Sequence, residues 1–450
     1  MIAPARIAAY DALLAVDAGR ADLPSALHRA RHALRDERDR ALAGEIASGV
    51  LRWQAALDHV IVAFAGRATT RLDREILAIL RIGLFQILHL DRVPASAVVD
   101  DAVEMARKAG KKSAAGFVNA LLRRASRERG ALPLPEAPAI DRLSITLSHP
   151  RWLADRWLSR YGEDAATTWA RFDNDPPSLT LRVNTLKTTR EALARQLAEA
   201  GVNVEPTRFA SDGLIVTSGN PLLTPLAHAG AFVVQDEASQ LVGEFVAAAP
   251  GERLLDACAS PGGKTTQMAA AMKETGIVVA ADVRGRRVAL LSRTVAESGA
   301  RNVRIVQANA RAAPAFGASF DAVLVDAPCS GLGTLRRDPD IRWRRNEADL
   351  PALAAAQSEM LTQLAGVVRP GGRLIYSTCS SEPDENDAVV RGFLAARPDF
   401  RRVIPARFAE RAELAALLDS EGALTTLPFR DGLEAFYAAC LVRTSDLLNC

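Results

Sequence analysis

The stretch Leu254-Leu-Asp-Ala-Cys-Ala-Ser-Pro-Gly-Gly-Lys-Thr-Thr266 decides the fold. A short apolar run leads into a turn with two adjacent glycines, and helical sequence follows. A glycine-containing turn between a strand and a helix lets the backbone approach a ligand closely. The stretch is not a nucleoside-triphosphate loop, because Cys258 stands where that loop needs its first glycine, and it has no Gly-x-Gly-x-x-Gly pattern.

Strands and helices alternate outward from this turn. From about residue 230, helical sequence separates five apolar runs that predict strands, at residues 253–258, 277–283, 303–309, 320–328 and 372–378. This alternation predicts a parallel, doubly wound α/β sheet of the Rossmann-like class. Such a sheet binds ligands beyond the carboxyl ends of its strands, at the topological switch point.

Two further parts precede the sheet. Residues 1–130 read as successive amphipathic helices, and three prolines within residues 130–138 mark a boundary. Residues 140–228 combine helical sequence with two strand-like runs, which predicts a small α/β module. The predicted domains are therefore 1–130, all-helical; 140–228, α/β; and 229–445, the doubly wound sheet.

Composition excludes several classes of protein. The 450 residues are 49% hydrophobic and 24% charged, which is ordinary for a globular chain and excludes general disorder, a disulfide scaffold or a fibre. We see no membrane-spanning run and no signal-peptide core, so a cytoplasmic location is expected. The five cysteines form no Cys-x-x-Cys pair and have no histidine cluster beside them, so reduced thiols and no metal site are expected.

The net charge of +3 hides an uneven distribution. Residues 1–140 carry a net charge of +5, and the remainder carries −2. Residues 107–129 hold eight basic side chains and one acid. The segment is either a solvated helix face or a phosphate-binding patch, in which Lys111, Lys112, Arg123 and Arg124 are the candidate contacts.

Polar residues at the ends of the first three predicted strands describe a pocket for an adenosine-bearing cofactor. Asp282 ends the second strand and suits hydrogen bonding to ribose hydroxyls, although Asp also favours a helix N-cap. Asn309 ends the third strand and can pair with an adenine edge. The candidate cofactor-binding residues are Cys258, Ala259, Ser260, Pro261, Gly262, Gly263, Lys264, Asp282, Asn309 and Asp326.

Two cysteines follow the fourth and fifth predicted strands. Because these strands are expected to be neighbours, about 5 Å apart, Cys329 and Cys379 should face one crevice. A thiolate there could add to carbon 6 of a cytosine and make carbon 5 nucleophilic, with an acid at ring nitrogen 3 and a base for the carbon-5 proton. Asp326, Cys329 and Cys379 are the candidates for these tasks.

The motifs at these positions resemble those of the RsmB/Sun family of RNA cytosine-5 methyltransferases. They are DACASPGGKT at Asp256–Thr265, DAPCSG at Asp326–Gly331 and STCS at Ser377–Ser380. Segments 181–187, 234–240 and 336–343 also resemble the family, and segment 116–124 looks like part of the NusB-type RNA-binding domain of its bacterial RsmB branch. The resemblance covers essentially the whole chain.

The resemblance implies a function and assigns roles by position. It implies S-adenosylmethionine as cofactor and a cytosine of 16S ribosomal RNA as substrate, either free or in a partly assembled small subunit, with the enzyme acting as a monomer. Cys379 matches the nucleophile, Cys329 the second cysteine that releases the product or acts as base, and Asp326 the acid near the cytosine. Two positions depart from the family pattern: Asn309 replaces the usual Asp, and Ser260 replaces a common Ala.

Other functions remain open at this point. A non-catalytic RNA-binding or ribosome assembly factor could keep the fold, and another RNA, tRNA or 23S, could be the substrate. In a DNA cytosine methyltransferase Cys329 would be the nucleophile, but Cys379 and the helical domain would have no place. Cys440 lies in a strand-like run and is expected in the core, and terminal Cys450 has no assigned role.

Overall fold

The computed structural model describes residues 2–312 and 317–444, so Cys450 lies outside the described residues. The chain divides into two compact units. The helical unit contains the residues up to Pro176 together with Leu335–Glu347, and the sheet unit contains Pro177–Thr334 and the residues from Ala348 onward. The segment 140–176, which we expected to open the α/β module, therefore packs with the N-terminal helices.

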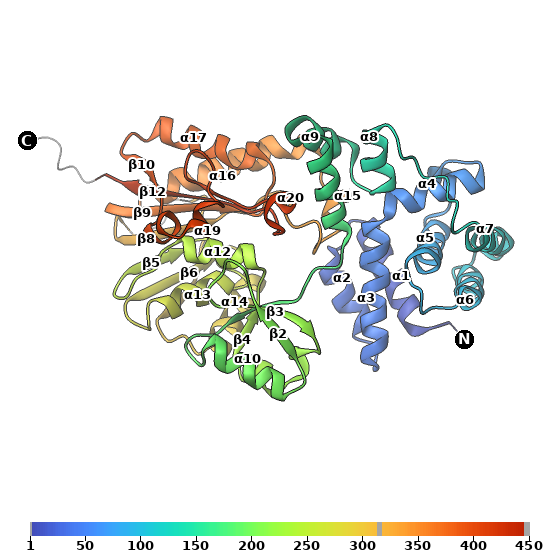
Figure 1. Cartoon of the computed structure of the whole chain (residues 1–450), viewed down its shortest axis with the longest axis horizontal. Helices are drawn as coiled ribbons and strands as arrows, with labels where there is room; N and C mark the ends of the chain where they lie inside the picture. The colour runs from blue at the N-terminus through green and yellow to red at the C-terminus, as the bar shows by residue number, and fades with distance from the viewer. Residues whose placement is uncertain (1, 313–316, 445–450) are drawn as a thin grey trace, which may run out of the picture. The chain divides into compact units, whose positions relative to one another are not determined.

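The helical unit is built from amphipathic helices (Figure 1), and those within residues 4–127 enclose one apolar core. Its elements are α1 (Pro4–Asp17), α2 (Leu23–Arg31), α3 (Glu37–Arg52), α4 (Gln54–Ala65), η1 (Thr69–Arg71), α5 (Arg74–His89), α6 (Ala95–Lys108), η2 (Lys112–Ala114), α7 (Ala115–Arg127), α8 (Ala139–Asp141), η3 (Arg142–Thr146), α9 (Arg151–Asn174) and α15 (Ile341–Arg344). The helices predicted for residues 1–130 are confirmed.

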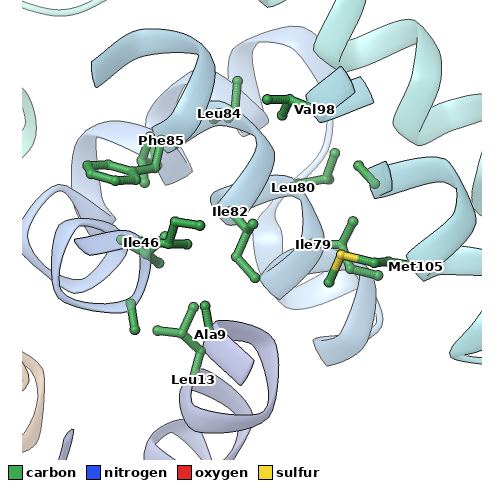
Figure 2. Close-up of a cluster of buried hydrophobic side chains, with 14 of the residues drawn as sticks. Ala9, Leu13, Ile46, Ile79, Leu80, Ile82, Leu84, Phe85, Val98 and Met105 are labelled. Atoms are coloured by element: carbon green, nitrogen blue, oxygen red, sulfur yellow. The ribbon is translucent and has the colours of Figure 1, made fainter. Parts of the chain in front are cut away.

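Helix α5 is the centre of this core. Figure 2 shows Ile79, Leu80, Ile82 and Phe85 of α5 among side chains from the surrounding helices. Gly49 of α3 allows the close approach, because a Cβ atom there would lie 1.9 Å from the Phe85 ring. Each fully buried Leu or Ile contributes about 1.5–3 kcal/mol of hydrophobic free energy, so this core stabilises the unit without a metal or a disulfide.

A small antiparallel sheet opens the sheet unit. Its strand order is β2-β3-β1-β4, and helix α10 packs beside β2 and β3. The elements are β1 (Thr180–Val183), α10 (Arg190–Glu199), β2 (Asn203–Pro206), β3 (Gly213–Ser218), η4 (Pro221–Leu223), α11 (Pro225–His228) and β4 (Phe232–Val234). The two strands predicted in this module are confirmed as β1 and β3, whereas the shorter β2 and β4 were not predicted.

The main sheet has the strand order β10-β12-β9-β8-β5-β6-β7, with β11 paired to β12. Its strands are β5 (Arg253–Asp256), β6 (Ile277–Asp282), β7 (Val303–Gln307), β8 (Phe320–Asp326), β9 (Val368–Thr378), β10 (Phe400–Val403), β11 (Leu424–Thr425) and β12 (Tyr437–Arg443). The strands from β9 to β7 are parallel, as predicted, and β12 and β10 extend the sheet in antiparallel pairing.

Helices cover both faces of this sheet (Figure 1). On one face lie α12 (Glu237–Phe245), α13 (Gly263–Ala271), α14 (Gly285–Ser298), α18 (Ala406–Glu410) and α19 (Ala412–Ala415); on the other lie α16 (Leu350–Ala365) and α17 (Asp387–Ala396). Successive strand residues alternate between the two cores, as Leu254 and Leu255 do. Cys440 lies in the first of these cores, as predicted. The unit also contains η6 (Pro383–Glu385) and α20 (Pro428–Asp431), and η5 (Glu347–Asp349) lies where the chain returns to it.

None of the helices described within residues 2–312 and 317–444 combines the length and apolar character needed to cross a bilayer.

Candidate active site

The glycine turn lies between β5 and α13, where the strand order switches direction. β5 pairs with β6 on one side and with β8 on the other, so its carboxyl end opens at the switch point of the sheet. Gly262 has a φ of +110°, and a Cβ atom there would lie 3.0 Å from Leu291. Only glycine adopts this backbone conformation without strain, so any other residue at Gly262 would distort the turn.

Two buried polar atoms at this turn have no partner among the described residues. They are Oδ1 of Asp256 and Oγ of Ser260. A buried polar atom without a hydrogen bond costs free energy unless a ligand or water satisfies it. The turn therefore fits a polar ligand, and Ser260 in place of the common Ala offers one more hydrogen-bonding group.

Carboxylates set the charge of this pocket. Burial, with a smaller contribution from the charge of Asp326, raises the pKa of Asp256 to about 7 against the 2.7 Å hydrogen bond from Thr265 Oγ1, which lowers it. Burial also raises the pKa of the Cys258 thiol, and Asp256, Asp326 and Asp282 add to the rise. Cys258 thus stays a neutral thiol, and the surrounding carboxylates favour a cationic ligand such as a sulfonium.

The two predicted nucleoside contacts lie at the carboxyl ends of neighbouring strands. Asp282 ends β6, is buried, and its Oδ1 accepts a 3.2 Å hydrogen bond from the backbone N–H of Arg284. Asn309 follows β7 and is exposed, and its Oδ1 accepts a 3.0 Å bond from the N–H of Arg311. The side-chain N–H₂ group of Asn309 can still donate to a ligand.

The two thiols expected to share a crevice lie in contact. β8 and β9 are parallel neighbours, with Asp326 opposite Ser377, and each chain continues into a cysteine within three residues. Sγ of Cys329 and Sγ of Cys379 are 3.3 Å apart. The predicted proximity of the two cysteines is therefore confirmed.

A cation lies on the Cys379 side of this pair. Lys264 Nζ donates to Oδ2 of Asp326 at 2.7 Å, and Ser377 Oγ donates to Oδ1 of Asp326 at 2.8 Å. Burial works to lower the pKa of Lys264, but the charge and hydrogen bond of Asp326 outweigh it, and the charges of Cys379 and Asp256 also help to raise the pKa. Lys264, predicted as a cofactor contact, is an ammonium at neutral pH and is held beside Asp326.

An anionic environment surrounds Cys329. The hydrogen bond with Cys379 holds the pKa of the Cys329 thiol well above its ordinary range, and burial and the charges of Cys379 and Glu385 raise it further. Cys329 therefore keeps its proton at neutral pH. Two identical side chains in contact thus occupy different electrostatic settings.

The candidate basic patch lies on the solvent face of α7 and in the turn before it. Lys111 Nζ is 2.9 Å from Oδ2 of Asp73, and this hydrogen bond, then the charge of Asp73, raise its pKa against desolvation. Arg124 pairs with Glu128 at 3.0 Å. Arg123 donates to the side-chain oxygen of Asn119 at 2.9 Å, and Lys112 is exposed.

One residue of this region was not foreseen. Glu385, six residues after Cys379, has a fully buried side chain, and its carboxyl oxygens accept hydrogen bonds from residues of both cysteine loops. The sequence offers only a weak signal, an acid in the polar run after a strand. Two of its partners, Ser330 and Gln357, lie 55 and 28 residues away along the chain.

Comparisons with known proteins agree with this arrangement. Three family models match the chain: 16S rRNA methyltransferase RsmB/F at residues 244–442, the NusB family at 3–127, and the RsmF/B-like ferredoxin-like domain at 149–222. The chain is 34% identical to the ribosomal RNA small subunit methyltransferase B of Pseudomonas putida, over 97% of this chain and 98% of that one. It is also 34% identical to the probable ribosomal RNA small subunit methyltransferase B of Bacillus subtilis, over 89% and 90%.

Solved structures share the fold. The crystal structure of PH0851 superposes with a TM-score of 0.81 at 27% identity, covering 98% of this chain and 99% of that one. A methyltransferase homologue from Pyrococcus horikoshii superposes with a TM-score of 0.59 at 26% identity, covering 68% of this chain and 99% of that one.

The doubly wound sheet, the glycine turn at its switch point and the acid after the next strand define a methyltransferase whose cofactor is S-adenosylmethionine. The residues that would hold this cofactor are those of the turn, with Asp282 at the ribose. The chain belongs to the RsmB/F family of 16S rRNA methyltransferases, as its motifs and its helical N-terminal domain predicted.

Proposed function

We propose that this protein methylates carbon 5 of a cytosine in 16S ribosomal RNA through a covalent bond between Cys379 and carbon 6 of the base. The observation that carries the proposal is the 3.3 Å contact between two thiols that follow the neighbouring strands β8 and β9. The ammonium of Lys264, held by Asp326, lies near Cys379, whereas the surroundings of Cys329 raise the pKa of its thiol and keep it protonated. Both thiols and the glycine turn come from one chain, which supports action as a monomer.

The first step is addition. The Cys379 thiolate forms a bond to carbon 6, and the carbon 5–carbon 6 π electrons shift through carbon 4 to nitrogen 3. Nitrogen 3 takes a proton from the Lys264–Asp326 pair, whose 2.7 Å hydrogen bond lets the carboxylate relay the proton of the ammonium. Ser377 donates to the other oxygen of Asp326 and fixes its orientation.

The remaining steps transfer the methyl group and release the base. S-adenosylmethionine, when bound, supplies the methyl group that carbon 5 attacks. The carbon-5 proton then leaves to water, its electron pair forms the carbon 5–carbon 6 double bond, and the bond from carbon 6 to Cys379 breaks with its electrons on sulfur. Nitrogen 3 returns its proton to the Lys264–Asp326 pair.

Cys329 assists this release as a hydrogen-bond donor to the departing Cys379 sulfur. The alternative role that we considered, a base at carbon 5, fits less well, because the surroundings of Cys329 hold its proton in place. Removal of the Cys329 thiol should therefore slow the release of the methylated base from Cys379 and leave the addition of Cys379 to carbon 6 intact.

Covalent trapping tests the assignment. On RNA that carries 5-azacytosine, the wild type should form a denaturation-resistant adduct, and Cys379→Ala should form none. On unmodified RNA, Cys329→Ala should accumulate an adduct that the wild type does not. An adduct formed by Cys379→Ala would mean that another residue is the nucleophile.

The helical unit is proposed to bind RNA through Lys111, Lys112, Arg123 and Arg124. Support comes from the exposure of Arg123 and Arg124 on α7 and of Lys112 in the turn before it, where phosphate contacts would release counterions. Asp73 and Glu128 already neutralise two of these charges, so Lys112→Ala with Arg123→Ala should flatten the salt dependence of binding more than Lys111→Ala with Arg124→Ala. An equal or unchanged salt slope in both pairs would leave the patch as a solvated face.

The RNA and its assembly state require a direct measurement. The names of the relatives support the small-subunit RNA as the substrate, and we propose that it is methylated either free or in a partly assembled subunit. A base stacked in a duplex hides carbon 6, so the target cytosine must be single-stranded or flipped out. Bisulfite mapping of 16S, 23S and transfer RNA from cells with and without this protein should reveal a lost 5-methylcytosine in 16S RNA alone.

A further inference from the structure

Glu385 connects the two loops that carry the cysteines. Its Oε1 accepts hydrogen bonds from the backbone N–H of Ser330 at 2.8 Å and from Gln357 Nε2 at 2.9 Å, and its Oε2 accepts one from Ser380 Oγ. Ser330 directly follows Cys329, and Ser380 directly follows Cys379. A single buried carboxylate therefore binds the residue next to each thiol.

A second set of bonds holds these loops from the other side. Gln357 of α16 also donates to the carbonyl oxygen of Pro328 at 3.1 Å, which fixes the residue before Cys329. Asn386 donates to the carbonyl oxygen of Ser380 at 2.9 Å, and the hydroxyls of Ser330 and Ser380 are 3.1 Å apart. Because the partners are backbone groups and short side chains, the separation of the two loops has little freedom to change.

The carboxylate also sets the charge near one thiol. Glu385 contributes to the anionic environment of Cys329, whereas the cation of the site, Lys264, pairs with Asp326 and lies near Cys379. The other titratable groups that face Cys329 are Cys379 itself and Tyr376 of β9, whose hydroxyl donates to the carbonyl oxygen of Glu385. A buried acid is costly unless it is fully hydrogen-bonded, and here both oxygens have partners.

We propose that Glu385 is a positioning residue of the covalent reaction, which holds the two cysteine loops at contact distance and whose negative charge reserves the shared proton for Cys329. The inference rests on the proposed function, in which Cys379 adds to the base and Cys329 donates to it on release. The side chain of Glu385 is fully buried, so it acts through the two loops that it binds.

Thiol alkylation tests the charge without RNA. The rate at which iodoacetamide modifies Cys329 is followed by mass spectrometry between pH 6 and 10 in the wild type, in Glu385→Gln and in the control Asp387→Asn. Asp387 is an acid of the same segment that pairs with Arg391 and Arg402 rather than with the cysteine loops. Loss of the neighbouring charge should shift the Cys329 profile of Glu385→Gln down by about one pH unit, which is about a tenfold faster modification at pH 8, and the control should match the wild type.

A charge-conserving variant separates charge from geometry. Glu385→Asp keeps the negative charge but has a shorter reach, so its Cys329 profile should stay close to the wild type while adduct formation with 5-azacytosine RNA slows. In Glu385→Gln, the rate at which the methylated base is released should be about tenfold lower. This rate should fall as the pH rises through the range in which Cys329 loses its proton, because the ionised thiol can no longer donate to Cys379. An unchanged Cys329 profile in Glu385→Gln would overturn the proposal.

These results separate two kinds of failure. If Cys379 is not the nucleophile, Cys379→Ala still forms an adduct with the RNA, and the proposed function fails. The alkylation profile of Cys329 is measured in protein without RNA, so it tests the effect of Glu385 independently of that outcome. A shifted Cys329 profile together with normal release in Glu385→Gln would refute the role of the charge in release and leave the covalent mechanism intact.

Discussion

Arg342 is expected to hold the segment Leu335–Glu347 in the helical unit, and its replacement by methionine should destabilise that unit. The side chain is 1% exposed. It donates to the carbonyl oxygens of Arg52, Ser148 and Asp173 at 3.0, 3.1 and 2.7 Å and to Asn174 Oδ1 at 2.8 Å. The guanidinium thus satisfies the ends of α3 and α9 and the loop between η3 and α9.

The magnitude follows from the acceptors that would lose their donors. Methionine fills a similar volume but donates nothing, so four buried oxygens lose a hydrogen bond, at about 1–3 kcal/mol each before water and relaxation compensate. Burial lowers the pKa of Arg342 to about 10 against the charge of Asp173, so removal of a desolvated cation returns part of this cost. The net loss should be about 3–5 kcal/mol, the range for one partner removed from a buried charged network.

Tryptophan fluorescence isolates this effect. All five tryptophans, Trp53, Trp152, Trp157, Trp169 and Trp343, belong to the helical unit, so emission during urea unfolding reports that unit alone. With a urea slope of about 2–3 kcal/mol/M, the midpoint for Arg342→Met should fall by about 1–2.5 M.

An arginine of an exposed ion pair in the same unit provides the control. Arg74 of α5 and Asp17 of α1 are 60% and 48% exposed and lie 2.6 Å apart. Exposed ion pairs contribute about 0–1 kcal/mol, so Arg74→Gln should move the midpoint by less than about 0.5 M. If Arg342→Met moves the midpoint no further than this control, the buried network does not stabilise the helical unit and the reasoning fails.

Three further variants test other contacts. Burial raises the pKa of Asp173 to about 7 and lowers the pKa of His149, 3.5 Å away, well below its usual value, so the folded pair carries one proton on Asp173. Between about pH 4 and 6.5 the unfolded pair also carries one proton, on His149, so the stability of the helical unit should vary little with pH. In Asp173→Asn only the unfolded state binds that proton, so the free energy of unfolding, measured with urea at pH 5, 6 and 7, should rise by about 1.4 kcal/mol per pH unit up to pH 6.5. Gly333→Ala would place a Cβ atom 1.9 Å from the carbonyl oxygen of Ala435, so it should cost about 1–3 kcal/mol and slow adduct formation, and normal values of both would contradict the tight approach. Asp282→Asn should weaken S-adenosylmethionine binding about 10–100-fold by calorimetry, because hydrogen bonds to a charged acceptor are worth about 1.5–3 kcal/mol, and an unchanged affinity would remove Asp282 from the ribose site.

The parallel strands could be predicted because strands buried on both faces read as continuous apolar runs. The runs at 253–258 and 320–328 were each placed within two residues of the observed β5 and β8. From their order alone, the carboxyl ends of β8 and β9 were expected side by side, and this brought Cys329 and Cys379 together. Strands such as β2 and β11 were missed because two to four residues carry too little pattern.

Other features depend on contacts that no local pattern records. The segment Leu335–Glu347 leaves the sheet unit between a cysteine loop and α16 to pack in the helical unit, and its sequence reads as an ordinary charged loop. Arg342 appears in that loop as one of several arginines, and only the fold shows that it is the buried one. Glu385 is similar, because its role comes from partners 28 and 55 residues away along the chain.

The different roles of the two cysteines do not follow from the residues themselves, since both end a strand and both carry the same thiol. Resemblance to a family assigns Cys379 the attack, and the surroundings supply a physical reason for the same choice. A lysine paired with Asp326 lies on the Cys379 side, and a buried glutamate contributes a negative charge near Cys329. Because the two sulfurs lie 3.3 Å apart, a charge placed near one of them also acts on the other. Exchange of those neighbouring charges, rather than of the cysteines, is therefore the more direct route to altering which thiol attacks the base.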